Sequence, residues 1–281
     1  KYNYIQNSPA AGIYIEASHA VVDSNTFKNN NNGIYIFNVP ENITISNNRI
    51  SNNTSYGFYC NYSRADINNN YFFDNYTYDM KEGQIKCENS EIEIDGNNIT
   101  GNENSYNSSA GILLNNTVST ITNDTIVNCY YGIKCENDSS YILNNVIKDT
   151  QYEGIFFYNS FSLVKENDFV NNGTGVYCYS SDSIVIIDND FDMRAGENES
   201  YGVICGNSRV KIDGNNFFDA GYAISCSYFS EVEILNNSIT QTLNGIFSDN
   251  SDLLIRNNFL SGTSYYCINN WNGTVQAYNN T

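Results

Sequence analysis

Apolar and polar residues alternate with a period of two in short segments along the whole chain, and one such segment returns about twelve times. Copies of it read NGIYIF, YGFYCN, YGIKCE and YGVICG, at residues 32–37, 56–61, 131–136 and 201–206. Successive strand side chains point to opposite faces, so a period of two predicts β-strands. In the first copy, Ile34 and Ile36 are predicted to point inward and Tyr35 outward.

Alignment of the copies places one residue type at each of two positions. Usually a glycine precedes the strand, at positions 12, 33, 57, 111, 132, 154, 175, 202 and 245, and Gln84, Ala223 and Cys267 take its place in the other copies. An asparagine follows in the pattern [IV]-x-x-N-x-[IF], at positions 25, 48, 70, 97, 145, 167, 189, 215, 237 and 257, with Asp124 as the one acid. Asparagine tolerates the left-handed backbone of a bend, and its amide can bond the copies on either side. We therefore expect an asparagine ladder.

The repeat period is 20 to 27 residues, and the repeats have no helical stripe. A coil of short strands fits this period, with successive turns stacked in parallel about 4.8 Å apart. The pattern resembles the right-handed parallel β-helix repeat of the pectin-lyase-like superfamily, including NosD-like and archaeal surface proteins. The expected fold is all-β, a parallel β-helix of about twelve rungs without capping helices. A single domain is expected to cover residues 1–281.

Charge and composition exclude several classes of function. The formal net charge of −18 would repel a phosphate backbone, so we expect no nucleic-acid partner. No apolar run approaches the roughly 18 residues that span a bilayer, so we expect no membrane insertion. No cofactor motif is present, so we expect no cofactor other than a structural Ca²⁺ at the acidic cluster described below.

The resemblance also implies which residues an enzyme of this fold would need. Pectate lyases combine clustered calcium-binding acids with an arginine base, and polygalacturonases carry Asn-x-Asp, Asp-Asp, Gly-His-Gly and Arg-x-Lys motifs. None of these motifs occurs in order in this sequence, and His19 is its only histidine. We therefore predict no catalytic residue and expect the protein not to be an enzyme.

One acidic cluster is a candidate metal site. Asp188, Asp190 and Asp192 alternate along one predicted strand, and Asp168 falls beside Asp190 one rung earlier. Stacked like charges are unfavourable unless water or a cation separates them, and carboxylates suit Ca²⁺. A solvated surface, a calcium site and a carboxylate pair for glycoside hydrolysis all stay open.

Six of the eight cysteines share one inward column three residues after the glycine position. The stacking distance lies within disulfide range, so Cys60 can pair with Cys87, and Cys205 with either Cys178 or Cys226. The alternative is a column of buried free thiols that pack like small apolar side chains. Disulfides would indicate an extracellular protein.

The two ends of the sequence fall at nearly the same phase of the repeat. Asn3 and Ile5 occupy ladder columns at the start, and Ala277 and Asn279 occupy them at the end. Exposed rungs are templates for pairing, so head-to-tail assembly of copies through these residues is expected.

Longer insertions after Asn70, Asn97 and Asn189 fall on one corner of the coil and can form a binding face or only decorate it. Candidate glycan acceptors in N-x-[ST] motifs are Asn75, Asn107 and Asn198. Outward tyrosines at 14, 35, 59 and 177 can bind sugars or stack between strands.

The leading functional hypothesis is an extracellular structural protein of a cell envelope that self-assembles end to end into a ring, tube or filament. Its acidic, Asn- and Tyr-rich repeats resemble archaeal, methanogen-type surface-layer or sheath proteins. Lateral contacts between copies and attached glycans are also expected. The alternative is a carbohydrate-active or carbohydrate-binding β-helix protein, or a fragment of an adhesin or tailspike.

Overall fold

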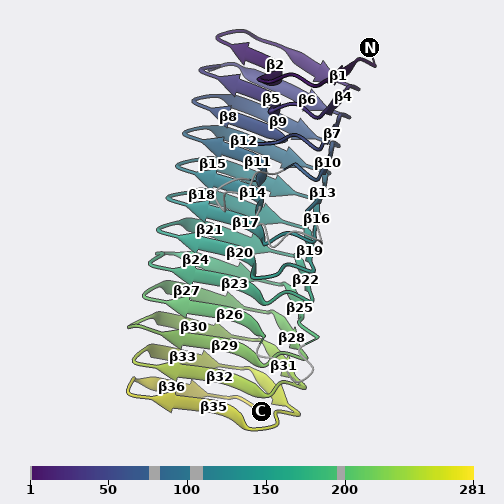
Figure 1. Cartoon of the computed structure of the whole chain (residues 1–281). Coiled ribbons are helices and arrows are strands. Elements are labelled where there is room, and N and C mark those ends of the chain that lie inside the picture. Colours follow the sequence, from purple (N-terminus) through teal and green to yellow (C-terminus); the bar gives the residue numbers. More distant parts are fainter. Residues whose placement is uncertain (1, 76–82, 102–109, 195–199) are drawn as a thin grey trace. The chain divides into compact units, whose positions relative to one another are not determined.

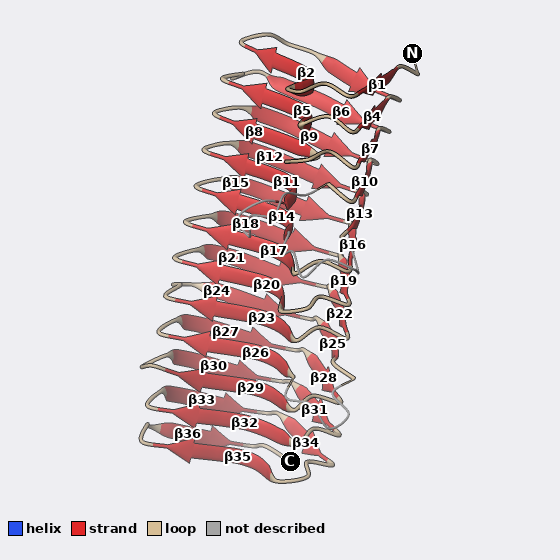
Figure 2. Ribbon diagram, viewed as in Figure 1, coloured by secondary structure: helices blue, strands red, loops and turns tan. Residues whose placement is uncertain are grey.

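The structure is a computed structural model that describes residues 2–75, 83–101, 110–194 and 200–281. Within these ranges the regular elements are strands and none is a helix (Figure 2), so the described chain has no helix that could cross a membrane. The chain divides into two compact units, residues 1–141 and 142–281. In each unit, every turn adds one strand to each of three parallel sheets, which we call A, B and C (Figure 1).

In the first unit, strands one turn apart pair in parallel within each sheet. Sheet A contains β1 (Tyr4–Gln6), β4 (Thr26–Lys28), β7 (Arg49–Ser51), β10 (Tyr71–Phe73), β13 (Asn98–Thr100) and β16 (Thr125–Val127). Sheet B contains β2 (Ala11–Glu16), β5 (Asn32–Phe37), β8 (Phe58–Asn61), β11 (Gly83–Glu88), β14 (Ala110–Asn115) and β17 (Tyr131–Glu136). Sheet C contains β3 (Val21–Asp23), β6 (Asn42–Ser46), β9 (Arg64–Asn68), β12 (Glu91–Asp95) and β15 (Val118–Thr122), and the unit boundary falls within β18 (Ser139–Leu143).

The second unit repeats this order. Its sheet A contains β19 (Val146–Lys148), β22 (Asp168–Val170), β25 (Asp190–Asp192), β28 (Asn216–Phe218), β31 (Ser238–Thr240) and β34 (Phe259–Ser261). Its sheet B contains β20 (Glu153–Tyr158), β23 (Thr174–Tyr179), β26 (Tyr201–Gly206), β29 (Tyr222–Ser227), β32 (Asn244–Asp249) and β35 (Tyr266–Trp271). Its sheet C contains β21 (Phe161–Lys165), β24 (Ile184–Ile187), β27 (Arg209–Asp213), β30 (Glu231–Leu235), β33 (Asp252–Arg256) and β36 (Val275–Tyr278). Six sheet-B strands per unit give twelve turns, which confirms the predicted fold class.

The core consists of inward side chains that repeat from turn to turn. Ile34 and Ile36 are fully buried while Tyr35 between them is partly exposed, as the alternation predicts. In the second unit, Phe169, Phe191 and Phe217 stack nearly parallel, with ring centroids 4.6 and 4.7 Å apart. Because neighbouring turns present identical side chains in register, aromatic stacking adds to the stabilisation from burial.

An asparagine ladder joins the turns at the bend between sheets C and A. The side-chain oxygen of Asn215 accepts bonds from the backbone N and the Nδ2 of Asn189, both at 2.9 Å, and Asn215 donates in the same way to Asn237. The residue before each ladder asparagine adopts a left-handed backbone, for example Asn236 with φ 54°. This local conformation turns the following amide inward.

The register differs from the sequence prediction at the last two ladder positions. Asn258 and Asn280 carry the ladder, because Asn237 donates to Asn258 and Asn258 donates to Asn280. Asn257 and Asn279 are the left-handed residues that precede them, with φ of 58° and 51°. The expected ladder position of Asn279 is therefore wrong. At these two positions the first asparagine of the pair makes the bend and the second makes the bonds.

The two other corners also contain polar ladders, which the sequence analysis did not predict. Between sheets A and B, Asn30 bonds to Asn53, Asn53 to Asn75 and Asn75 to Gln84. Asn75 is fully buried in this ladder, so the prediction of a glycan at Asn75 is wrong for the folded chain. The other two glycosylation candidates, Asn107 and Asn198, lie outside the described residues.

A serine ladder follows the corner between sheets B and C in the second unit. The backbone N–H of Ser160 donates to the hydroxyl of Ser181, and the same bond repeats along the turns that follow, at Ser208, Ser230 and Ser251. At each corner of the coil, buried polar side chains thus accept hydrogen bonds from the backbone of the turn. Buried backbone groups need such partners because water cannot reach them.

The cysteine column is buried as expected. Cys60 lies beside Cys87 in register, and Cys205 lies between Cys178 and Cys226. All eight cysteines are free thiols in the structure, and the predicted disulfides stay predictions. Burial raises the pKa of Cys87, whereas hydrogen bonding with Cys87 lowers the pKa of Cys60, so Cys60 is the better thiolate of that pair.

We expect the six column cysteines to resist iodoacetamide in the native protein, because each is fully buried. Mass spectrometry after alkylation checks this result. Alkylation in denaturant without reductant then tests the pairing: six modified column cysteines would rule out the predicted bridges, and protection of Cys60 together with Cys87 would support one.

Candidate ligand-binding groove

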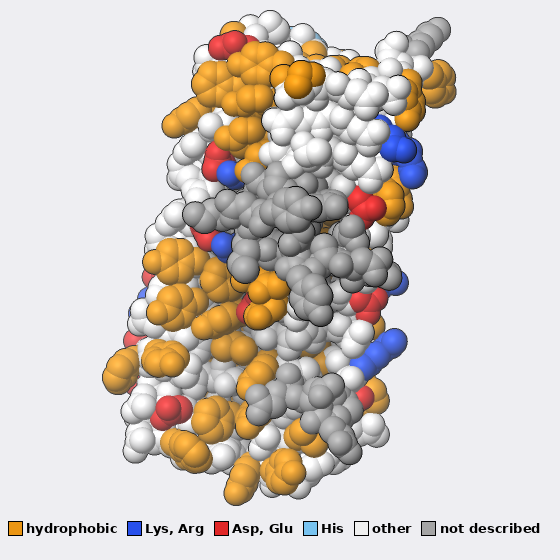
Figure 3. All heavy atoms as spheres, in the orientation of Figure 1, with side chains coloured by type: hydrophobic (Ala, Val, Ile, Leu, Met, Phe, Trp, Pro, Cys, Tyr) orange, Lys and Arg blue, Asp and Glu red, His pale blue; other side chains and the backbone are white. Residues whose placement is uncertain are grey.

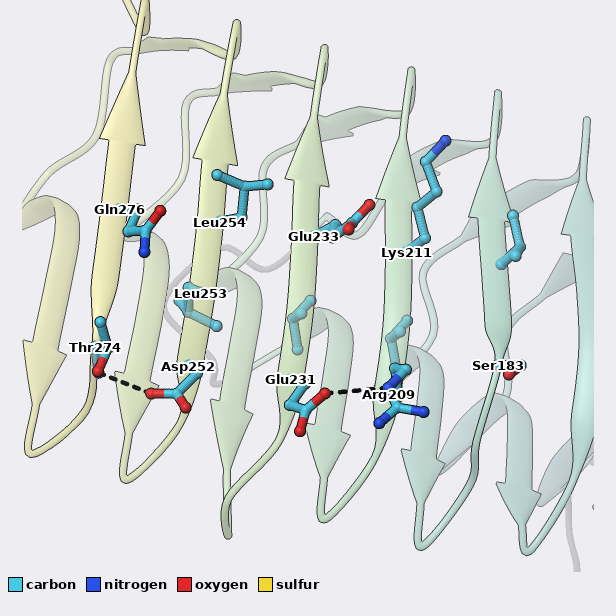
Figure 4. Close-up of a pocket in the computed structure, with 13 residues that line it drawn as sticks. Ser183, Arg209, Lys211, Glu231, Glu233, Asp252, Leu253, Leu254, Thr274 and Gln276 are labelled. Carbon is cyan, nitrogen blue, oxygen red and sulfur yellow. Dashed lines mark hydrogen bonds and ion pairs between the residues drawn. The ribbon is translucent and has the colours of Figure 1, made fainter.

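A groove of about 620 Å³ crosses the outer face of sheet C in the second unit. It runs over five strands, from β24 to β36 (Figure 4). Successive strands of a sheet lie about 4.8 Å apart, so the groove is roughly 19 Å long and perpendicular to the strands. This shape suits an extended ligand that follows the stack of turns.

Two rows of outward side chains form the groove, because alternate residues of each strand face solvent. The first row, near the starts of the strands, is Ser183, Arg209, Glu231, Asp252 and Thr274. The second row, two residues further along each strand, is Val185, Lys211, Glu233, Leu254 and Gln276. The rows therefore mix hydrogen-bond donors, acceptors and two apolar side chains.

Ion pairs fix the cations of the groove. Arg209 Nε lies 3.1 Å from Glu231 Oε2, and its Nη1 lies 3.0 Å from Asp182 Oδ1. Lys211 Nζ lies 2.9 Å from Asp213 Oδ2. These exposed pairs contribute little to stability, but they hold the donor groups in place for a ligand.

Two carboxylates of the groove point to solvent without an ion-pair partner in the described structure. Glu233 is exposed in the second row, and its negative charge helps to raise the pKa of Lys211, for which the bond to Asp213 is the main cause. Asp252 accepts one bond, from the backbone N–H of Thr274 at 3.1 Å. Both side chains can accept hydrogen bonds from a ligand.

This groove was not predicted from the sequence. Its residues are the outward positions of RVKID, EVEIL, DLLIR and VQAY, which look like ordinary solvated strand faces. Only the register of the five strands shows that these side chains lie next to one another. The alternation of apolar and polar residues predicts which of them point outward, but not which are neighbours.

The predicted acidic cluster is only partly assembled. Asp168 and Asp190 are neighbours on β22 and β25, and burial, followed by the charge of Asp190, raises the pKa of Asp168. Asp188 lies in the preceding turn with φ 55°, and Asp192 pairs with Arg194 at 3.3 Å. Among the described residues, no group of three or more acids, histidines or cysteines could hold a metal ion. The calcium site stays a prediction.

A row on sheet B of the first unit contains three of the predicted outward tyrosines, Tyr14, Tyr35 and Tyr59 (Figure 3 shows hydrophobic side chains gathered over β2 and β5). The fourth, Tyr177, lies on β23 of the second unit, beside Phe156. Tyr35 and Tyr59 stack at 4.8 Å with their planes 21° apart, and Tyr14 meets Tyr35 edge-on at 5.1 Å. The hydroxyl of Tyr59 donates to Glu88 at 2.6 Å. Tyr35 and Tyr59 turn their faces toward each other, so this row stabilises the stack of turns more than it offers flat surfaces to a sugar.

Two overlapping segments of the chain, residues 1–90 and 77–191, match the family model described as right handed beta helix region. No curated protein matches the chain. The chain resembles the solved structure of the periplasmic alginate epimerase AlgG, with 13% identity over 90% of this chain and 76% of that one, at a TM-score of 0.57.

A second similar structure is tailspike protein 3 of bacteriophage CBA120, with 12% identity and a TM-score of 0.57. The alignment covers 99% of this chain and 55% of the tailspike, so the chain spans about half of that protein. At such identities these likenesses concern the fold alone.

Proposed function

Because the chain belongs to the right-handed β-helix family, we propose that it is an extracellular protein that binds a neutral polysaccharide in the groove across sheet C. The observation that carries this proposal is the mixed set of donors and acceptors along one extended groove on a rigid sheet. The proposal is binding without bond cleavage, because the sequence lacks the acid and base motifs of the pectate lyases and polygalacturonases.

The repeated arrangement of the groove favours a polymer with a repeated arrangement of hydroxyls. Donors (Arg209, Lys211, Gln276) and acceptors (Glu231, Glu233, Asp252) recur along its length. A sugar hydroxyl both donates and accepts, so one ligand can satisfy both kinds of group. The apolar side chains of Val185 and Leu254 can contact the C–H surfaces of sugar rings.

Charge and backbone bonding disfavour the other extended ligands. Three carboxylates against two cations in the groove, on a chain of net charge −18, would repel nucleic acids and acidic polysaccharides. A peptide strand cannot add to the face of sheet C, because the backbone groups of β27, β30 and β33 already pair with the strands on both sides. A neutral glycan meets neither obstacle.

Secretion and surface exposure are part of the proposal. One similar structure supports both the location and the ligand class. It is a periplasmic epimerase of alginate, so a protein of this fold can meet a polysaccharide outside the cytoplasm.

Removing two groove side chains tests the proposal. We expect Lys211→Ala with Glu233→Ala to weaken binding of a neutral polysaccharide about tenfold or more, because two charge-assisted hydrogen bonds are lost. Affinity electrophoresis in gels containing glucan, mannan or xylan measures the effect, with alginate and polygalacturonate as acidic comparisons. Glu93→Ala is the matched control, because Glu93 is an exposed glutamate of sheet C in the first unit.

If none of the neutral polysaccharides slows the migration of the wild-type protein, the proposal is contradicted. If the double variant and the wild type are slowed equally, the groove is not the binding site.

The second candidate function is a structural envelope protein whose copies join head to tail. It is favoured by the constant register within each unit, since a strand from another copy could add through the same bonds that join neighbouring turns. In the proposed contact, Asn3 and Ile5 of one copy meet Ala277 and Asn279 of the next copy, where Asn280 carries the asparagine ladder. Electron microscopy of the purified protein should then show rings, tubes or filaments, and monomers at high concentration would contradict this role.

A further inference from the structure

A second cavity, of about 230 Å³, opens beside the groove at the corner between sheets B and C. We call it the side pocket. It shares Arg209 and Glu231 with the groove, and Phe229 and Asp182 also line it. Its volume equals about eight waters, which is the size of a single sugar ring rather than of a chain. The pocket therefore branches from the side of the extended groove.

The turn that contributes Phe229 has an unusual backbone. Tyr228 and Phe229 are consecutive residues with φ of 55° and 62°, the left-handed region that bulky side chains rarely adopt. The equivalent turn one rung earlier has a single left-handed residue, Asn207 with φ 50°. The consecutive pair is therefore strained, whereas a single asparagine makes the equivalent turn one rung earlier.

The strain places two aromatic rings in solvent. Phe229 is 80% exposed and Tyr228 is 65% exposed. Phe229 forms a wall of the side pocket, whereas Tyr228 lies on the other side of the corner, beside Gly206. The inner wall of the pocket is polar, since its serines belong to the buried corner ladder. A site with one aromatic wall, a fixed guanidinium and the carboxylates of Asp182 and Glu231 suits one sugar ring.

We infer that the side pocket binds a single-sugar branch of the polysaccharide whose backbone lies in the groove. The ligand class is thus a branched neutral polysaccharide. This inference rests on the proposed function of the groove and adds the recognition of a side branch. Arg209 and Glu231 contact both parts of the ligand, and Phe229 stacks against the branch.

Matched oligosaccharides with the same backbone, unbranched or carrying single-sugar branches, test the inference by isothermal titration calorimetry. Mannan, glucan and xylan backbones of six sugars are compared. For the backbone that binds, the branched form is expected to bind at least fivefold more tightly than the unbranched form. Phe229→Gly is expected to remove this difference and leave the affinity for the unbranched form unchanged.

The control variant is Tyr228→Gly, which relieves the same kind of strain without touching the side pocket. Both variants should be at least as thermally stable as the wild type, so lost binding cannot be attributed to unfolding. Equal affinity of the wild type for both forms would overturn the branch pocket while leaving the groove. A branch preference that survives Phe229→Gly would also overturn it. Binding of no oligosaccharide would overturn the proposed function and this inference together.

Discussion

Replacing Asn215 by alanine is expected to lower the free energy of unfolding by about 3 kcal/mol or more. The substitution removes the acceptor for two donors of Asn189 and the donor to the carbonyl oxygens of Ile186 and Asp213. Asn215 is fully buried, so water cannot replace these bonds. Each buried polar group left without a partner costs roughly 1–3 kcal/mol, and the ladder loses several at once.

The adjacent residue provides the matched control. Asn216 is exposed and donates one bond, to Asp190 at 2.7 Å. Asn216→Ala is expected to change the free energy of unfolding by about 0.5 kcal/mol or less. Urea denaturation followed by far-UV circular dichroism compares the two variants. A loss at Asn216 as large as that at Asn215 would mean that the ladder is not the source of stability.

The second large effect is expected at Asp124, the one acid in the asparagine ladder. Its Oδ1 accepts bonds from the backbone N and the Nδ2 of Asn97, at 2.6 and 2.9 Å. Burial raises the pKa of Asp124 to about 7 from its usual value of 3.8. Between about pH 4 and pH 7 the folded state therefore keeps a proton on Asp124 that the unfolded state has released. The contribution of Asp124 to the free energy of unfolding is fully present below about pH 4 and is lost as the pH rises through 7.

Asp124→Asn removes this cost and restores the amide of the ladder. We expect the variant to be more stable than the wild type at pH 8 by up to about 4 kcal/mol, with the gain shrinking toward pH 4. Thermal unfolding at several pH values measures the difference. Glu93→Gln, which neutralises an exposed acid, is the control for the loss of one charge and should change the free energy of unfolding at pH 8 by about 0.5 kcal/mol or less. A loss of stability of Asp124→Asn at pH 8 would contradict the account.

The sequence was sufficient to predict the repeat and most of the columns. Inward isoleucines such as Ile34 recur with a period of two, and a slip of one residue would expose every one of them, so burial fixes the register. The asparagine ladder was predictable for the same reason. It failed at Asn257 and Asn279, because two adjacent asparagines carry the same sequence signal and only the left-handed backbone tells them apart.

Features that depend on several turns at once were not predictable. Asn75 looked like a loop residue, and only the path of the corner places it in a buried ladder with Asn53 and Gln84. The groove unites outward residues that are 20 or more positions apart, such as Lys211, Glu233 and Leu254. The strain at Phe229 depends on the one extra residue of its turn. The insertions expected to form a binding face lie largely outside the described residues, at 76–82, 102–109 and 195–199.

Methyl NMR during titration with a neutral polysaccharide tests most directly the claim that the groove across sheet C is the binding site. The methyl groups of Val185 and Leu254 line the groove, whereas Val118 is an exposed valine of sheet C in the first unit. The account predicts progressive shifts of the Val185 and Leu254 methyl signals, with the Val118 signal unchanged. Binding that leaves both groove methyl signals unmoved would contradict it.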